Sequence, residues 1–375
     1  MPRFMKKGKP LVFKILFLVN ILVVVPLLIS YFAAYISPVK IWQFAFFGLA
    51  YPIFLAANLL FVLLWLVFWK RYIFISLIVI LIGWNFLQSL YPLQFNLKRG
   101  HPGKPLKMVS YNVNLFSGNQ QSESPSETRN DISSFLISQN ADIICLQEFY
   151  LSGPDYSKII QDYAQSIGMK YFYFGNYRKF WDKKKIDAII IFSRFPILDT
   201  GFFKIPDRSL YGIFTDVVYE QDTMRIYNLH LESIRFGNDD YSFYSNLTNP
   251  SEKIPPIEEG TKKTFWKLKK AFIFRAKEVD TLQKHLNASP YPIIMTGDFN
   301  DTPASYTYHQ LTRKLKDSFV SCSNEFFGST YAGRFPAFRI DYILHSDFFY
   351  AEDYQKYKLD FSDHYPVTAT FLLNP

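Results

Sequence analysis

The chain has 375 residues, a formal net charge of +9 and two cysteines, Cys145 and Cys322. Its length exceeds that of a usual single domain, so two regions are expected. Two cysteines exclude both a disulfide scaffold and a cysteine-rich zinc site, and buried free thiols are the simplest interpretation.

The positive charge is confined to the N-terminal part of the sequence. Residues 1–107 hold 12 Lys or Arg and no Asp or Glu, which leaves 29 basic and 32 acidic residues in 108–375. The basic character therefore belongs to the first region, and it is weak evidence for nucleic-acid binding by the second.

Three uncharged, apolar stretches follow one another in this first region, at 15–38, 41–69 and 72–97. Each reaches the roughly 20 apolar residues with which a helix crosses a bilayer. A cleaved signal peptide is the alternative for the first stretch, but that stretch is too long and two further apolar segments follow it. The sequence predicts a membrane region over 1–97, with transmembrane helices at about 15–38, 41–69 and 72–92, and a linker at 98–106.

An odd number of spans would place the N-terminus and the C-terminal region on opposite sides of the membrane. Six Lys or Arg residues flank the side that holds the N-terminus and five flank the other side. Because the first helix usually dominates orientation, its basic N-terminal cluster is expected to stay inside. The prediction is an integral protein of a bacterial-type inner membrane, with an extracytoplasmic C-terminal domain at 107–375.

This C-terminal domain alternates short β-rich runs with helical patterns. The expected strands are 107–112, 142–147, 187–193, 212–219, 224–230, 292–298, 339–344 and 366–372, and the expected helices are 128–139, 156–167, 264–287 and 303–312. Interleaved strands and helices with hairpin-like neighbours indicate packed sheets flanked by helices. The interval 234–262, rich in Asn, Ser, Pro and Glu, is expected to be a long inserted loop.

Polar residues stand at the ends of several of these apolar runs, as they do where rigid strands build a site along one edge of a sheet. Carboxylate and amide oxygens suit Mg²⁺ or Mn²⁺ better than zinc, and a magnesium site commonly polarises a phosphate ester. Singly, such residues are more often turn or cap residues. The set comprises four carboxylates, two amides and two histidines: Glu148, Asp298, Asp341, Asp363, Asn112, Asn300, His230 and His364.

The order and number of these motifs resemble those of the endonuclease/exonuclease/phosphatase family of magnesium phosphoesterases, over roughly residues 105–375. The most specific matches are Gly297-Asp298-Phe299-Asn300 and Ser362-Asp363-His364, supported by Leu146-Gln147-Glu148. The resemblance implies an α/β fold, a four-layer α/β sandwich in which two packed, mostly antiparallel sheets are flanked by helices. It also implies a site at one edge of the sheets.

Carried over to this sequence, the resemblance makes Glu148 the main metal ligand, with Asn112 and Asp363 completing or supporting the site. The implied cofactor is Mg²⁺, with Mn²⁺ as an alternative.

The resemblance also assigns the catalytic positions. Asp298 would activate the attacking water or assist proton transfer, and Asn300 would orient the water or the phosphate. His364, paired with Asp341, would contact the scissile phosphate or act as the base. His230 matches a position where deoxyribonuclease-like and sphingomyelinase-like members carry His. No expected catalytic position is missing, which favours an active enzyme over a degenerate copy.

The expected reaction is in-line attack of water on the phosphorus of a phosphodiester. The substrate would be nucleic acid or a phospholipid headgroup, and a tether close to the bilayer would raise the effective concentration of headgroups. A phosphomonoesterase of the same family and a non-catalytic membrane-bound interaction module are the alternatives. The expected partners are therefore the phosphodiester substrate and the lipid bilayer, and the sequence implies no protein partner.

Overall fold

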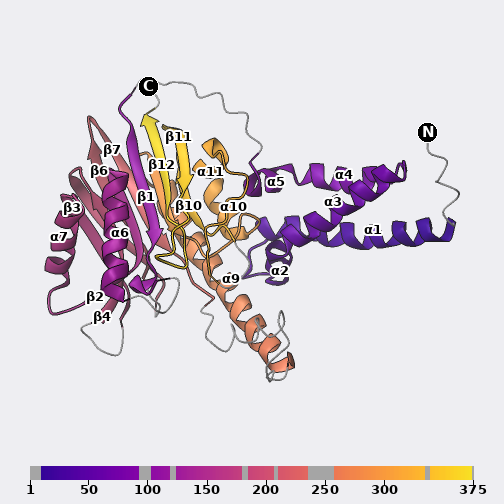
Figure 1. The fold of residues 1–375 in the computed structure, drawn as a ribbon, viewed down its shortest axis with the longest axis horizontal. Helices are drawn as coiled ribbons and strands as arrows, with labels where there is room; N and C mark the ends of the chain where they lie inside the picture. Colours follow the sequence, from indigo (N-terminus) through magenta and orange to yellow (C-terminus); the bar gives the residue numbers. More distant parts are fainter. Residues whose placement is uncertain are drawn as a thin grey trace.

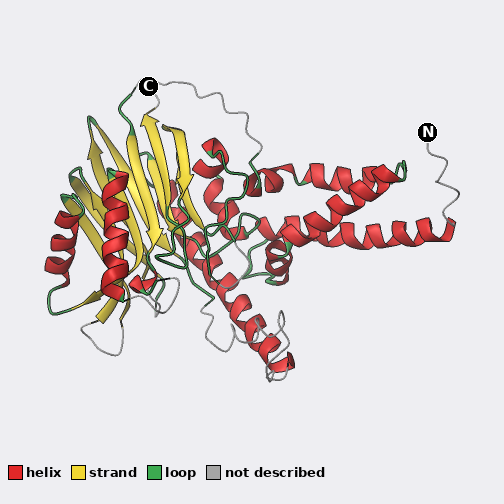
Figure 2. Cartoon of the chain, in the orientation of Figure 1, coloured by secondary structure: helices red, strands yellow, loops and turns green. Residues whose placement is uncertain are grey.

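The computed structural model describes residues 10–92, 103–118, 124–179, 185–206, 210–234, 257–333 and 338–373. Within these residues the chain forms two six-stranded sheets (Figures 1 and 2). The first sheet has, in spatial order, β11 (Phe349–Lys356), β12 (Val367–Leu373), β1 (Leu106–Asn112), β2 (Ile143–Ser152), β4 (Lys185–Ser193) and β3 (Tyr171–Lys179). The second has β5 (Ile197–Lys204), β6 (Leu210–Tyr219), β7 (Asp222–His230), β8 (Ile293–Asp298), β10 (Asp341–His345) and β9 (Lys316–Asp317).

Each sheet contains one parallel pair of strands, and its other described pairs are antiparallel. The parallel pairs are β1 with β2 and β7 with β8, which lie inside their sheets. In these pairs Asn112 lies opposite Gln147, and His230 lies opposite Asp298. Parallel neighbours end at the same edge of a sheet, so each sheet brings two strand ends to one edge.

The two sheets pack face to face and helices cover their outer faces, as expected for a four-layer α/β sandwich. The core between the sheets is apolar and includes Met108, Cys145, Ile191, Ile226 and Ile294. The first sheet is covered by α6 (Pro125–Gln139) and α7 (Tyr156–Ser166), and the second by α9 (Ile257–Asn287) and α10 (Tyr306–Thr312). Both cysteines are free and buried, as predicted.

The expected elements are present, with several boundaries to correct. The strand predicted at 142–147 continues to Ser152, and the helix predicted at 303–312 begins at Tyr306. The helix predicted at 264–287 begins earlier, at Ile257, so residues 257–262 of the interval predicted as a loop are helical. The remainder of that interval from 235 to 256, and residues 98–102 of the predicted linker, lie outside the described residues.

The N-terminal region is helical, but only its first apolar stretch forms one uninterrupted helix of membrane length. That stretch, Leu11–Ala34, comprises α1 (Pro10–Tyr31) and a following 3₁₀ turn, and it is long and apolar enough to cross a membrane. The second and third stretches are bent pairs, α2 (Gln43–Leu49) with α3 (Tyr51–Val67) at 58° and α4 (Ile73–Ile82) with α5 (Trp84–Leu90) at 72°. Each of these stretches is long enough to span a membrane only if its two bent helices are taken together as one span. The prediction of three uninterrupted transmembrane helices is corrected to one such helix and two bent pairs.

The bends coincide with residues that interrupt a helix. Pro52 stands in the first turn of α3, where a residue without a backbone N–H is tolerated because that donor has no helical partner there. Gly83 separates α4 from α5, and a Cβ at this position would collide with the ring of Tyr31. Close approach of Tyr31 therefore requires glycine at the break, and the third stretch turns at that point.

The N-terminal helices pack on one another and on the sandwich, while α1, α3 and α4 project away from it (Figure 1). Arg339 Nη2 donates to the carbonyl of Ser89 at 2.7 Å. Phe46 of α2 stacks on Phe265 of α9 with ring centroids 4.9 Å apart. The orientation of these helices relative to the sandwich is therefore fixed by side-chain contacts as well as by chain connectivity.

Candidate active site

The strand ends of both sheets bring the predicted site residues together. Asn112 ends β1, His230 ends β7 and Asp298 ends β8, while Asp341 begins β10 directly opposite Asp298. The segment Ser362-Asp363-His364 precedes β12, and the Ser362 hydroxyl donates to the carbonyl of Asn112 at 2.8 Å. The edge predicted from the sequence is therefore assembled from both sheets.

Glu148 lies at an irregularity in the pairing of β2, and its carboxylate points into this edge. The pairing of β2 with β4 shifts register between Leu146 and Phe149, and Glu148 has φ +52°. A left-handed conformation is costly for a residue with a side chain, and such positions cluster at functional sites. Its side chain is 23% exposed, and Oε1 lies 3.2 Å from Asn112 Nδ2 and 3.5 Å from His230 Nε2.

Asp298 occupies the centre of the site. Its Oδ1 accepts from the backbone N–H of Asn300 at 2.8 Å, and its Oδ2 accepts from the side-chain amides of Asn300 and Asn112 at 3.1 Å each. Burial raises the pKa of Asp298 to about 7; the nearby His364 opposes this rise, while the Asp341 carboxylate adds to it. A carboxyl with a pKa near neutrality can accept and release a proton, as a general base must.

His364 is held by a buried carboxylate. Its Nδ1 lies 3.0 Å from Asp341 Oδ2 and 3.2 Å from Oδ1, and its Nε2 faces Asp298 Oδ2 at 3.8 Å. Burial lowers the pKa of His364, but the Asp341 and Asp298 carboxylates outweigh burial and leave the pKa well above its usual value. These carboxylates therefore favour the cationic ring, in which Nδ1–H donates to Asp341 and Nε2–H faces the site.

The donor set suits a hard divalent cation. Four carboxylates meet here, and among the described residues no Lys or Arg forms an ion pair with any of them. Burial raises the pKa of Asp363, and the nearby Glu148 carboxylate raises it further while His364 opposes the rise. Such an excess of negative charge is the environment that a bound Mg²⁺ or Mn²⁺ would neutralise.

Two observations refine the choice of metal ligands. Asp298, Asp341 and His364 place ligand-type atoms within 4.8 Å of one another. Because His364 Nδ1 and Asp341 are at hydrogen-bond distance, we interpret these two as a hydrogen-bonded pair, which leaves Glu148 as the more accessible ligand. Asn112 Oδ1 accepts from the backbone N–H of Asn114 at 3.0 Å, while its Nδ2 faces Glu148 and Asp298. The amide would therefore have to turn over to offer its oxygen to a metal beside Glu148.

Buried polar residues behind the site were not predicted from the sequence. Asn228 donates through Nδ2 to the carbonyls of Leu146 and Ile190 in the other sheet, at 3.0 and 2.8 Å, and its Oδ1 accepts from Gln147 Nε2 at 2.6 Å. An amide within an apolar strand was the available signal, since a buried amide requires partners.

Arg275 of α9 was also missed. Its Nε donates to Asp301 Oδ2 at 3.1 Å and its Nη1 to the carbonyl of Glu232 at 3.0 Å. These bonds tie together the segments that follow β7 and β8. The available signal was a charge on the apolar face of the helix, between Phe272 and Val279 at helical spacing.

The two packed sheets, with carboxylates and histidines gathered at their strand ends, place the chain in the class of α/β-sandwich proteins. Residues 109–364 match the profile of the endonuclease/exonuclease/phosphatase family, and the chain belongs to this family, whose members hydrolyse phosphoester bonds and generally use divalent metals. Residues 13–90 match a domain of unknown function, DUF8431. The comparison with curated proteins found no match.

Solved structures share the fold at low sequence identity. An endonuclease/exonuclease/phosphatase from Beutenbergia cavernae superposes with a TM-score of 0.54 and 15% identity, covering 72% of each chain. The human Nocturnin catalytic domain with bound sulfate superposes with a TM-score of 0.50 and 16% identity, covering 72% of this chain and 95% of that one. At these identities the similarity establishes the fold and not the substrate.

Proposed function

We propose that this protein is a membrane-anchored, divalent-metal-dependent phosphoesterase that hydrolyses phosphodiester bonds. The observation that carries the proposal is that His364, hydrogen-bonded to Asp341, converges on Asp298 beside the partly exposed carboxylate of Glu148. A general base, a cationic donor and a carboxylate-rich metal site are the groups that hydrolysis of a phosphate ester requires.

Each residue has a role that follows from its contacts. Glu148, with Asp363 and Asn112, would hold Mg²⁺ or Mn²⁺, which supplies polarisation of the phosphate and charge neutralisation when bound. Asp298 accepts the proton of the attacking water, and Asn300, fixed by its two hydrogen bonds to Asp298, orients that water or the phosphate.

The two histidines complete the site. His364 donates from Nε2 to a phosphate oxygen as negative charge develops there, because Asp341 keeps Nδ1–H engaged on the other side of the ring. His230 faces both Glu148 and Asp298 through Nε2, at 3.5 and 3.8 Å, and from there it would contact the phosphate.

Membrane insertion through three spans is part of the proposal. It is supported by large apolar side chains exposed along α1, α3 and α4, including Leu22 at 70%, Leu60 at 66% and Ile82 at 66%. The basic N-terminal cluster favours an inside N-terminus and an extracytoplasmic catalytic domain. A C-terminal alkaline phosphatase fusion would be active with this orientation, and an inactive but expressed fusion would contradict it.

The substrate is proposed to be a phosphodiester, either of nucleic acid or of a phospholipid headgroup. Attachment of the sandwich to apolar helices, through contacts such as Phe46 with Phe265, favours the lipid because it holds the site close to the bilayer.

The deciding experiment is hydrolysis of bis-(p-nitrophenyl) phosphate and p-nitrophenyl phosphate by the full-length protein, with Mg²⁺, Mn²⁺ or EDTA. We expect metal-dependent turnover of the diester that Asp298→Asn abolishes. Asp216→Asn is the matched control, because Asp216 is an equally buried strand aspartate that pairs with Arg225 away from the site.

The other outcomes separate the alternatives. Turnover of the monoester alone would indicate a phosphomonoesterase. No turnover of either compound, together with no thermal shift on adding Mg²⁺, would favour a non-catalytic interaction module. If the diester is cleaved, DNA, RNA and phospholipid vesicles would be compared next at equal phosphodiester concentration.

A further inference from the structure

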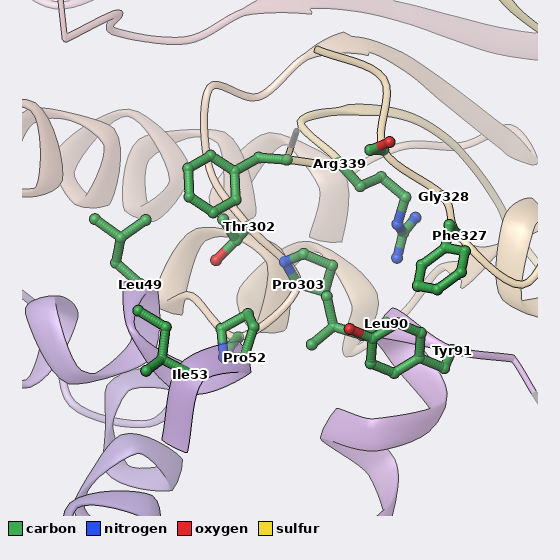
Figure 3. Close-up of a pocket in the computed structure, with 13 residues that line it drawn as sticks. Leu49, Pro52, Ile53, Leu90, Tyr91, Thr302, Pro303, Phe327, Gly328 and Arg339 are labelled. Atoms are coloured by element: carbon green, nitrogen blue, oxygen red, sulfur yellow. The ribbon is translucent and has the colours of Figure 1, made fainter. Parts of the chain in front are cut away.

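A cavity of about 520 Å³ lies between the N-terminal helices and the loops of the sandwich (Figure 3). Its volume falls in the range of roughly 300–1,000 Å³ that is typical of small-molecule sites. Leu49 of α2 and Pro52 and Ile53 of α3 form one side, and Leu90 and Tyr91 at the end of α5 form another. The sandwich supplies the rest of the wall from Thr302, Pro303, Ala304, Phe327, Gly328, Ser329, Phe338 and Arg339.

The wall is mainly apolar and reaches the molecular surface. Ile53 is 70% exposed and Phe327 is 64% exposed, so the space communicates with the outside at both the helical and the sandwich side. Protein interiors rarely leave voids of this size, and water is poorly held where few polar partners exist. An apolar occupant therefore fits the cavity better than water does.

Arg339 is the charged residue in this wall, and it is almost fully buried. Its Nη1 pairs with Asp317 Oδ2 at 2.6 Å and its Nη2 donates to the Ser89 carbonyl at 2.7 Å. Within the described residues its Nε has no hydrogen-bond acceptor, and this atom is fully buried, so an occupant of the cavity does not reach it. Because Asp317 already balances the charge of Arg339, this wall carries no uncompensated charge, which suits an uncharged, apolar occupant.

We propose that this cavity binds the acyl chain of a bilayer lipid. The proposal rests on the membrane insertion proposed above. The helices that line the cavity also present exposed apolar residues, such as Leu60 of α3, so a chain can enter from the surrounding bilayer.

The position of the cavity links its occupant to the active site. Thr302 and Pro303 follow Asp301 in the loop that leaves β8 beyond Asp298, and Arg339 lies two residues before Asp341. A bound chain would therefore contact the loop that follows Asp298 and the segment that precedes Asp341.

Photo-crosslinking of the full-length protein in lipid nanodiscs tests this inference. The probes are phosphatidylcholine with a diazirine on its acyl chain and, in a separate arm, the corresponding free diazirine fatty acid. After irradiation, adducts are mapped by peptide mass spectrometry. We expect phosphatidylcholine adducts within 302–304 or 327–329, on the sandwich side of the cavity, and their loss in Leu49→Trp, which fills the cavity. Leu60→Trp is the control, because this exposed residue of α3 does not line the cavity.

Adducts confined to outward-facing positions of the helices would overturn the proposal, as would equal labelling of the catalytic loops in Leu49→Trp and Leu60→Trp. Labelling by the free fatty acid alone would overturn the assignment to a bilayer lipid. If Leu49→Trp does not fold, Ser329→Leu replaces it. Absence of adducts from 302–304 and 327–329 in the wild-type protein would overturn the proposal whatever the variants show. Hydrolysis of bis-(p-nitrophenyl) phosphate is measured on the same samples. Turnover without these adducts would refute only lipid binding in the cavity, and adducts without turnover would refute only the proposed phosphoesterase activity.

Discussion

Replacing Asp341 by Asn removes the charge that holds His364 while keeping nearly the same side-chain volume. Asp341 is 2% exposed, and both of its oxygens lie within 3.2 Å of His364 Nδ1. A hydrogen bond between charged groups is worth roughly 1.5–3 kcal/mol, and 1.36 kcal/mol corresponds to a tenfold rate, so we expect kcat to fall about 10- to 150-fold. KM should change little, because the interaction strengthens as charge develops on the phosphate.

The assay is steady-state hydrolysis of bis-(p-nitrophenyl) phosphate by Asp341→Asn, with melting temperature measured in parallel. Asp216→Asn is the control for loss of a buried aspartate: Asp216 binds Arg225 through both oxygens, at 2.6 and 2.7 Å, and lies outside the site. The control should melt at a lower temperature with unchanged kcat of the folded protein. A kcat of Asp341→Asn equal to that of wild type would refute the role given to the Asp341–His364 pair.

Three further predictions concern the metal, the loops around the site and pH. Glu148→Gln should abolish both turnover and the rise in melting temperature on adding Mg²⁺, and an undiminished Mg²⁺ shift measured by differential scanning fluorimetry would rule out Glu148 as a ligand. Arg275→Met leaves Asp301 without its buried cation, so the free energy of unfolding, measured in urea, should fall by about 3–5 kcal/mol. Lys270→Met, at an exposed position of the same helix, should leave the free energy of unfolding unchanged. Burial, aided by the nearby Arg225 cation, lowers the pKa of His285, so the folded state favours the neutral ring. The unfolded chain then binds a proton more readily than the folded one, and the free energy of unfolding should decrease as the pH falls below about 6.5, the pKa in the unfolded chain. His285→Phe should therefore lose less stability than wild type on acidification, and equal losses in pH-dependent melts would contradict this.

The central strands were predictable and the outermost strands were not. The strands that escaped prediction, β3, β5, β9 and β11, lie at or next to the sheet edges: β3 and β11 end the first sheet, and β5 and β9 end the second. A central strand is buried on both faces and appears as a continuous apolar run, whereas β5 leaves most of its residues exposed or half-exposed. β9 has only two residues and no periodicity to detect. The sequence signal follows burial, and burial is weakest at the edges.

The site residues were predictable as residue types at strand ends, but their geometry was not. The left-handed conformation of Glu148 depends on a local register shift against β4, which no sequence pattern near Glu148 indicates. The direction of the Asn112 amide depends on the backbone N–H of Asn114. Likewise, the chain turns at Gly83, where the ring of Tyr31 leaves no room for a side chain. Tyr31 is distant in sequence, so the apolar composition of the third stretch does not indicate this contact.

The site also depends on the alignment of the two sheets, because each sheet supplies half of it. Asn112 and Glu148 come from the first sheet, whereas His230 and Asp298 come from the second. Apolar contacts between sheets are not directional, so they would tolerate a small displacement of one sheet over the other.

The hydrogen bonds of the buried Asn228 amide are directional, and they fix the alignment of the two sheets. It lies in β7, two residues before His230, and it hydrogen-bonds across the inter-sheet core to the carbonyl of Leu146, two residues before Glu148. Displacing one sheet by a residue would leave this amide and its partners buried without hydrogen bonds, a loss of roughly 1–3 kcal/mol for each group. The polar contact therefore selects the one alignment in which Glu148 and His230 face each other at 3.5 Å, and the chemistry of the site requires that alignment.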